Sequence, residues 1–155
     1  MHLQYVDHRD RTHFPMGGDP VAQLSDAQRA FVQDNAFVGT VTTLRADGSP
    51  HSTVVWVDTD GDEVVRFNTA RGRAKEVHVL RDPRISITVI DPQDQFRWVG
   101  VTGTAELVDE GADDHIDQLA KKYLGADSYP FREATEQRVI VRITVDRVDG
   151  IGFDA

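Results

Sequence analysis

Apolar and polar residues alternate along six segments of the chain, with the period of two that is typical of β-strands with one buried face. The segments span residues 37–44, 51–57, 63–67, 84–90, 96–108 and 138–145. Turns that contain Asp-Gly join the first three segments, which predicts an antiparallel meander. Gly103 interrupts the longest segment, and we expect a bulge or bend there.

Three other stretches have the period of an α-helix. Ser25 and Gln28 have the spacing of a capping box, and the apolar positions that follow predict a helix to about Asn35. Residues 72–80 predict a second helix, which Asp82-Pro83 ends, and residues 110–124 predict a third. Six strands with interposed helices predict a mainly β protein whose antiparallel sheet forms a closed or partly closed barrel.

The first twenty residues have no clear period. They contain three histidines together with Pro and Gly, and they predict a flexible N-terminal arm over 1–20, followed by a single domain over 21–155. No cysteine accompanies these histidines, and we predict no metal site there. Asp58, Asp60 and Asp62 resemble the start of a calcium loop, but a glycine in fourth position favours a hairpin turn.

Charge singles out one segment of the chain. The net charge is −9, yet residues 66–84 contain six basic and two acidic residues, a local charge of +4. A strand passes there into a helix, and the backbone N–H groups at a helix start attract anions. Arg73 and Lys75 would add charge-assisted hydrogen bonds, so we predict a phosphate site. The alternative is that these residues only solvate a surface helix.

Several classes of function are excluded or disfavoured by composition. The chain has no cysteine, which excludes disulfides, thiolate catalysis and cysteine-ligated metals. Its acidic balance disfavours nucleic acid and anionic membranes as partners. It has no apolar run of membrane-spanning length and no signal-peptide pattern, so we expect a cytoplasmic protein.

From about Leu24 to Val148 the chain resembles a known superfamily, in the order and spacing of several motifs. These motifs are residues 39–56, Phe67-Asn-Thr69, Arg73-Ala-Lys75, Arg81-Asp-Pro-Arg84, residues 97–104, Lys122-Tyr-Leu-Gly125 and residues 138–144. In them the chain is similar to the split β-barrel flavin and deazaflavin oxidoreductases of the pyridoxamine 5′-phosphate oxidase superfamily, and within it to the branch that uses coenzyme F420. The C-terminal Trp and Arg signature of true pyridoxamine phosphate oxidases is missing, so we do not expect vitamin B6 oxidation.

The resemblance implies a six-stranded split β-barrel that forms a homodimer, with two cofactor sites at the subunit interface. The cofactor phosphate would lie against Arg73 and Lys75, and the tricyclic ring along the second strand. Trp98 would reach the cofactor from the neighbouring subunit. The full set of implied cofactor-binding residues is Thr53, Val54, Val55, Trp56, Asn68, Thr69, Arg73, Ala74, Lys75 and Trp98.

The activity implied by the resemblance is hydride transfer from reduced F420 to a small conjugated or unsaturated organic acceptor. The alternatives are an FMN-dependent oxidoreductase similar to pyridoxamine-phosphate oxidase, and a non-catalytic protein that binds a cofactor or a tetrapyrrole. No side chain is assigned as catalytic, although His51, near the presumed ring, is a candidate proton donor. F420 is favoured over FMN because Arg71, Arg73 and Arg81 could line a cationic exit for its polyanionic tail.

Overall fold

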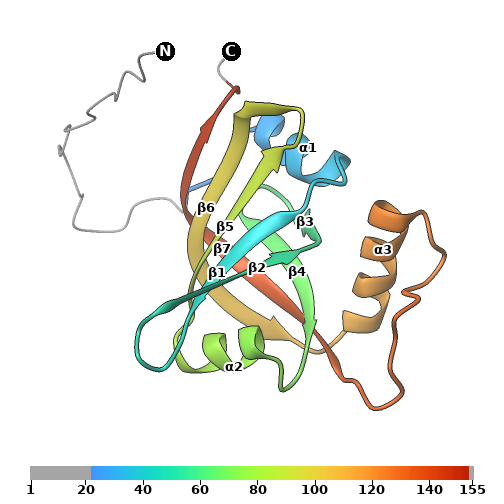
Figure 1. The fold of residues 1–155 in the computed structure, drawn as a ribbon. Coiled ribbons are helices and arrows are strands. Elements are labelled where there is room, and N and C mark those ends of the chain that lie inside the picture. Colours follow the sequence, from blue (N-terminus) through green and yellow to red (C-terminus); the bar gives the residue numbers. More distant parts are fainter. Residues whose placement is uncertain (1–21, 154–155) are drawn as a thin grey trace.

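Seven β-strands form one antiparallel sheet, which curls so that its faces become the inside and outside of a split barrel (Figure 1). The computed structural model describes residues 22–153, so the predicted arm over 1–20 and its histidines lie outside this range. The order of strands across the sheet is β2-β1-β5-β6-β7-β4-β3. The strands are β1 (Gly39–Leu44), β2 (Pro50–Val55), β3 (Val57–Thr59), β4 (Val64–Ala70), β5 (Arg84–Asp91), β6 (Asp94–Val108) and β7 (Arg138–Ile151).

The predicted mainly β, antiparallel barrel is confirmed, but the predicted count of six strands is wrong. The expected single strand over 51–57 divides at Trp56, because β2 pairs with β1 whereas β3 pairs with β4. β2 and β3 are therefore the two edges of the sheet, and one residue joins them. The alternation continues across this corner, since Val55 and Val57 are both buried, and so the sequence pattern does not mark the break.

Gly103 forms the predicted irregularity in β6. The register between β6 and β7 shifts between Thr102 and Gly103. A Cβ atom on Gly103 would lie 2.1 Å from the carbonyl oxygen of Thr144, so only glycine allows this close approach of the two strands.

The three predicted helices are present as α1 (Asp26–Asp34), α2 (Ala74–Arg81) and α3 (Ala112–Leu124). The capping box of α1 is formed, with Ser25 Oγ accepting from the Gln28 N–H at 3.1 Å and Gln28 Oε1 accepting from the Ser25 N–H at 2.9 Å. Figure 1 shows α1 and α2 at opposite ends of the barrel and α3 beside it. No helix within 22–153 is both long and apolar enough to cross a membrane.

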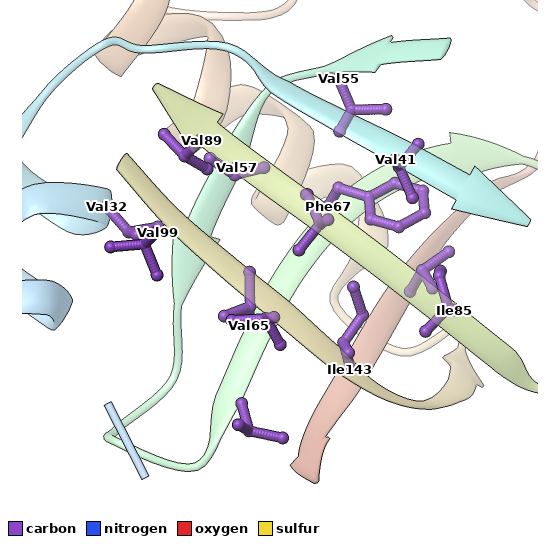
Figure 2. Packing of buried hydrophobic residues seen from close by; sticks show 14 of the residues in the cluster. Val32, Val41, Val55, Val57, Val65, Phe67, Ile85, Val89, Val99 and Ile143 are labelled. Atoms are coloured by element: carbon purple, nitrogen blue, oxygen red, sulfur yellow. The ribbon is translucent and has the colours of Figure 1, made fainter. Parts of the chain in front are cut away.

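The core fills the inside of the barrel with side chains from the inward faces of the strands (Figure 2). Phe31 and Val32 of α1 and Val79 of α2 belong to the same cluster, so these helices close the barrel ends. Helix α3 packs instead on the outer face of β4 and β7, with its own buried face of Ala112, His115, Ile116, Leu119 and Ala120. The site described next lies along this second, smaller interface.

Candidate functional site

A pocket of about 230 Å³ opens between the first turn of α2, the edge strand β2 and helix α3. It receives side chains from six parts of the chain that are distant in sequence. Its lining consists of Val54, Val55, Trp56, Asn68, Thr69, Arg73, Lys75, Ile116, Leu119, Tyr129, Phe131 and Arg138. Of the residues that the resemblance implied, Thr53, Ala74 and Trp98 do not line it.

The pairing of β4 with β7 brings the basic residues of this pocket together. Ala70, the last residue of β4, is opposite Arg138, the first residue of β7. Beyond Ala70 the chain turns at Gly72, whose positive φ of 87° suits glycine, and Arg73 then forms the N-cap of α2. The start of α2 therefore faces the start of β7.

Arg138 is buried, and its position is fixed by several contacts. Its Nε donates to Asn68 Oδ1 at 2.8 Å and its Nη1 donates to Glu136 Oε1 at 2.7 Å. The guanidinium carbon lies 5.2 Å from the centre of the Tyr129 ring, within cation–π range. Arg73 donates from Nη2 to the same Glu136 oxygen at 2.7 Å, so one carboxylate holds both arginines.

Lys75 is the third cation of the pocket. Burial, and then the charges of Arg73 and Arg138, lower the pKa of Lys75, and no carboxylate among the described residues offsets them. The pocket is therefore lined by three cations, of which Glu136 compensates only Arg73 and Arg138. Bound anions would relieve the repulsion between these cations, which is the electrostatic character of a phosphate site.

Thr69 adds an unused polar group to the same pocket. Its side chain is buried, yet Oγ1 has no hydrogen-bond partner within residues 22–153. Because buried hydroxyls are nearly always hydrogen-bonded in proteins, this group is available to a bound molecule. It stands at the end of β4, beside the cations.

Arg71 and Arg81 lie outside the pocket lining. Arg71 donates from Nε and Nη2 to Asp109, at 2.9 and 2.7 Å, and from Nη1 to Glu76 at 3.0 Å. These hydrogen bonds raise the pKa of Arg71 and compensate its charge within the protein. Arg81 donates to the carbonyl of Leu44. The two arginines are thus engaged elsewhere, which weakens the expectation that they line a cationic exit.

His51 and Trp98 also lie away from the pocket. The His51 ring meets the His78 ring edge-on at 5.1 Å, and His78 Nδ1 is 2.8 Å from Thr43 Oγ1. Trp98 is half-buried on β6, where it lines a separate groove with Thr88 and Arg147. Within one subunit, therefore, neither residue lines the pocket.

A buried hydrogen-bond chain supports Asn68 from behind. The Asn68 amide donates to the Ala112 carbonyl at 2.9 Å and contacts His115 Nδ1 at 3.1 Å, while its oxygen accepts from Arg138. Since a carbonyl only accepts and a guanidinium only donates, these partners fix the amide orientation. His115 Nδ1 must then accept, and His115 Nε2 donates to Asp58, at 3.1 Å from Oδ1.

Asp58 ends this chain in a buried ion pair. Arg66 donates to both carboxylate oxygens, from Nε at 3.0 Å and from Nη2 at 2.7 Å. Burial alone would raise the pKa of Asp58, but hydrogen bonds from His115 and Arg66 outweigh it and lower the pKa. This chain of hydrogen bonds thus joins β3, β4 and α3, and it holds Asn68 and Arg138 in place.

Aromatic side chains form one wall of the pocket. The Trp56 ring stacks on Tyr123 with centres 5.4 Å apart and planes at 10°, and it meets Tyr129 edge-on at 6.0 Å. Phe131 continues the wall from Tyr129 at 5.7 Å and is 66% exposed. Arg132 holds this loop to α3 through Asp113 and Asp117. Neighbouring rings of the wall, Trp56 with Tyr129 and Tyr129 with Phe131, stand nearly perpendicular to one another, so the wall offers both faces and edges of rings to a bound molecule.

The Lys122-Tyr-Leu-Gly125 motif fixes the corner at Trp56. The Lys122 ammonium donates to the carbonyls of Val32 and Val57 at 2.7 Å each, and burial lowers the pKa of Lys122 to about 8. Tyr123 accepts from the Val57 N–H at 3.0 Å and donates to the Phe37 carbonyl at 2.6 Å. These contacts anchor α3 to the point where the two sheet edges meet.

Comparison with known proteins identifies the family to which this architecture belongs. The sequence model of pyridoxamine 5′-phosphate oxidase matches residues 24–152. The chain belongs to the pyridoxamine 5′-phosphate oxidase family.

Similar proteins include F420-dependent enzymes. The F420H2-dependent biliverdin reductase of Mycobacterium tuberculosis is 29% identical over 129 residues, which cover 83% of this chain and 88% of the relative. A solved F420 reductase has a TM-score of 0.67 and 25% identity, over 77% of this chain and 94% of that one. A conserved hypothetical protein of M. tuberculosis has a TM-score of 0.63 and 26% identity, over 83% and 84% of the two chains.

Proposed function

We propose that the protein is an F420-dependent oxidoreductase that transfers a hydride from reduced deazaflavin to a small conjugated or unsaturated organic acceptor. The observation that carries the proposal is a pocket lined both by three cations, Arg73, Lys75 and Arg138, and by the aromatic rings of Trp56 and Tyr129. A phosphate and a planar ring on the same molecule match this combination. Relatives that use F420 support the choice of cofactor.

The pocket residues suit the two halves of such a cofactor. Arg73, Lys75 and Arg138 would hold the phosphate, with a hydrogen bond from the Thr69 hydroxyl. The ring would lie along residues 53–56, because β2 is an edge strand whose outer backbone groups pair with no further strand of the described sheet. Those N–H and C=O groups match the donor and acceptor pattern of a pyrimidine edge.

The bound cofactor would supply the hydride, so the protein needs to bind, orient and exclude water rather than to provide a nucleophile. Phe131 and Tyr129 stand at the mouth of the pocket, where an acceptor with a planar conjugated system could pack. An acceptor of this kind is consistent with the conjugated substrate named for the mycobacterial reductase.

We also propose that two copies associate through the outer face of β1, β5 and β6. This face carries small hydroxyl side chains, including Ser86, Thr88 and Thr102, and an apolar border in which Ile90 is 46% and Ile151 50% exposed. Exposed apolar borders of this kind favour association. In such a homodimer, Trp98 of the partner subunit would approach the pocket. Light scattering at micromolar concentration tests the proposal, and a monomer would refute it.

Titration of the protein with F420 and with FMN, followed by turnover of each reduced cofactor, tests the main proposal. We expect tighter binding of F420, and oxidation of reduced F420 when a conjugated acceptor is added. Tighter binding of FMN with rapid peroxide formation would instead support a flavin oxidoreductase. Binding of F420 without hydride transfer to any acceptor would support a non-catalytic cofactor-binding protein.

A further inference from the structure

A buried carboxylate stands directly behind the arginines of the pocket. The Glu136 side chain is only 5% exposed, and its Oε1 accepts from Arg73 Nη2 and from Arg138 Nη1, both at 2.7 Å. Its second oxygen, Oε2, is buried and has no hydrogen-bond partner among residues 22–153. Glu136 does not itself line the pocket, so it acts on a bound molecule through the two arginines and through its charge.

This carboxylate reduces both the charge and the free donors of the pocket. One terminal nitrogen of each arginine is committed to Glu136, and Nε of Arg138 is committed to Asn68. An anion bound between Arg73, Lys75 and Arg138 would also lie near the negative charge of Glu136. That repulsion grows in proportion to the charge of the bound anion, so it is twice as large for a dianion as for a monoanion.

Phosphate monoesters and diesters differ in their negative charge, and this charge determines how strongly a nearby carboxylate repels them. A monoester carries a charge of about −1.5 to −2 at pH 7 and presents three terminal oxygens, each of which accepts strong hydrogen bonds. A diester has no second ionisable hydroxyl, carries a single negative charge and presents two terminal oxygens. FMN ends in a monoester, whereas the phosphate of F420 is a diester because the tail continues beyond it.

We infer that Glu136 shifts the selectivity of the pocket toward a phosphodiester and away from a phosphomonoester, by holding and partly neutralising Arg73 and Arg138. The inference rests on the proposed function for the identity of the ring, but not for the ester preference. It also gives a source of discrimination between F420 and FMN that Arg73 and Lys75 alone cannot provide, since both cofactors present a ribityl phosphate. Glu136 is in this sense a positioning residue that sets specificity.

The test compares two pairs of ligands that differ only at the phosphate or its extension. The flavin pair is FMN and its phosphate methyl ester, and the deazaflavin pair is the deazaflavin riboside 5′-phosphate and F420. Dissociation constants are measured for the wild type, for Glu136→Gln and for a control, Glu133→Gln. Glu133 is an exposed residue of the same loop, so its variant removes the same charge without touching the arginines.

Glu136→Gln retains an acceptor for both arginines but removes the charge. Relative to the wild type, we expect it to change the ratio of the two dissociation constants about tenfold in favour of FMN over its methyl ester, the size of effect that one nearby charge produces at a partly screened site. The change should come mainly from tighter binding of FMN. Glu133→Gln should keep the wild-type ratio. A merely structural role for Glu136 would weaken both members of a pair equally and leave the ratio unchanged.

The inference is overturned if Glu136→Gln changes both affinities by the same factor. Because the ratio compares two ligands on one protein, a smaller folded fraction of the variant changes both apparent affinities equally and leaves the ratio valid. The two proposals fail separately. Preference for flavins over deazaflavins at equal ester state would refute F420 dependence alone, and an unchanged ester ratio in Glu136→Gln alone would refute the role of Glu136.

Discussion

Two polar clusters meet on the outer face of β4, and they differ in how their charges are compensated. In the first, Asp58 pairs with Arg66 through two hydrogen bonds and accepts a third from His115. In the second, Glu136 accepts from Arg73 and Arg138, and no carboxylate within residues 22–153 offsets the charge of Lys75, which leaves an excess of positive charge. Asn68 contacts both, since its amide touches His115 and its oxygen accepts from Arg138.

The difference separates a structural role from a binding role. The Asp58 cluster lies under α3 with its donors and acceptors matched, so it fixes the helix to the sheet and needs no external partner. The Arg73 cluster borders a pocket and has an unsatisfied hydroxyl at Thr69, so it becomes fully compensated only with an anion. Substitutions in the first should therefore affect folding, and substitutions in the second should affect binding.

The largest expected effect is the destabilisation caused by Asp58→Ala. It leaves the guanidinium of Arg66 and the buried imidazole of His115 without their acceptor, and loss of one partner of a buried ion pair costs about 3–5 kcal/mol. Urea unfolding of the wild type and the variant measures this difference. Asp60→Ala is the control, because Asp60 pairs with Arg142 in an exposed position where about 1 kcal/mol or less is expected. Equal losses for both variants would contradict the structural role.

Lys75→Ala should weaken cofactor binding without destabilising the fold, which is the reverse of the effect expected for Asp58→Ala. Loss of a charge-assisted hydrogen bond to phosphate, about 1.5–3 kcal/mol, raises the dissociation constant of F420 roughly ten- to a hundredfold. The free energy of unfolding without ligand should not decrease, because burial and two neighbouring arginines disfavour this ammonium group. Fluorescence titration and urea unfolding give the two values, with the exposed Lys121→Ala as control. An unchanged dissociation constant would remove Lys75 from the site.

Asn68→Ala should affect both clusters by smaller amounts. It removes the acceptor for Arg138 Nε and the donor for His115 Nδ1, and an unsatisfied buried group costs about 1–3 kcal/mol. We expect a loss of stability in this range together with a several-fold weaker binding of F420, since Arg138 keeps its contacts to Glu136 and Tyr129. If only one of the two properties changed, the clusters would not be coupled through Asn68.

The sequence predicted only part of the second cluster, for a physical reason. Arg73 and Lys75 are close in sequence and share a helix start, so local charge was sufficient to find them. Arg138 lies more than sixty residues further on, and only the register of β4 with β7 places it opposite Ala70. One sequence feature could have indicated it, because Arg138 opens a strand whose next three residues, 139–141, are apolar and buried.

The same distinction applies to the fold. The sequence signals for the capping box, the Asp-Gly turns and the irregularity at Gly103 each span only a few residues. Each of these features lies where the sequence pattern predicted it. The corner at Trp56 depends instead on a change of pairing partner between β2 and β3, which alternation cannot reveal. Tyr129 and Phe131 were missed because the loop that carries them has no period and is positioned by Arg132 on α3.

The smallest expected effect is the acid sensitivity that Asp58 of the first cluster gives to the free energy of unfolding. The folded-state pKa of Asp58 is lowered, so its contribution to stability is complete above its unfolded pKa of about 3.9 and is lost as the pH falls through the folded value. The arginines and Lys75 stay protonated throughout this range and contribute no such slope. We expect the free energy of unfolding of the wild type to fall more steeply below about pH 4 than that of Asp58→Asn, which retains an acceptor but cannot titrate. Urea unfolding at pH 6, 4 and 3 measures both slopes, and equal slopes would show that the Asp58 cluster does not supply this acid sensitivity.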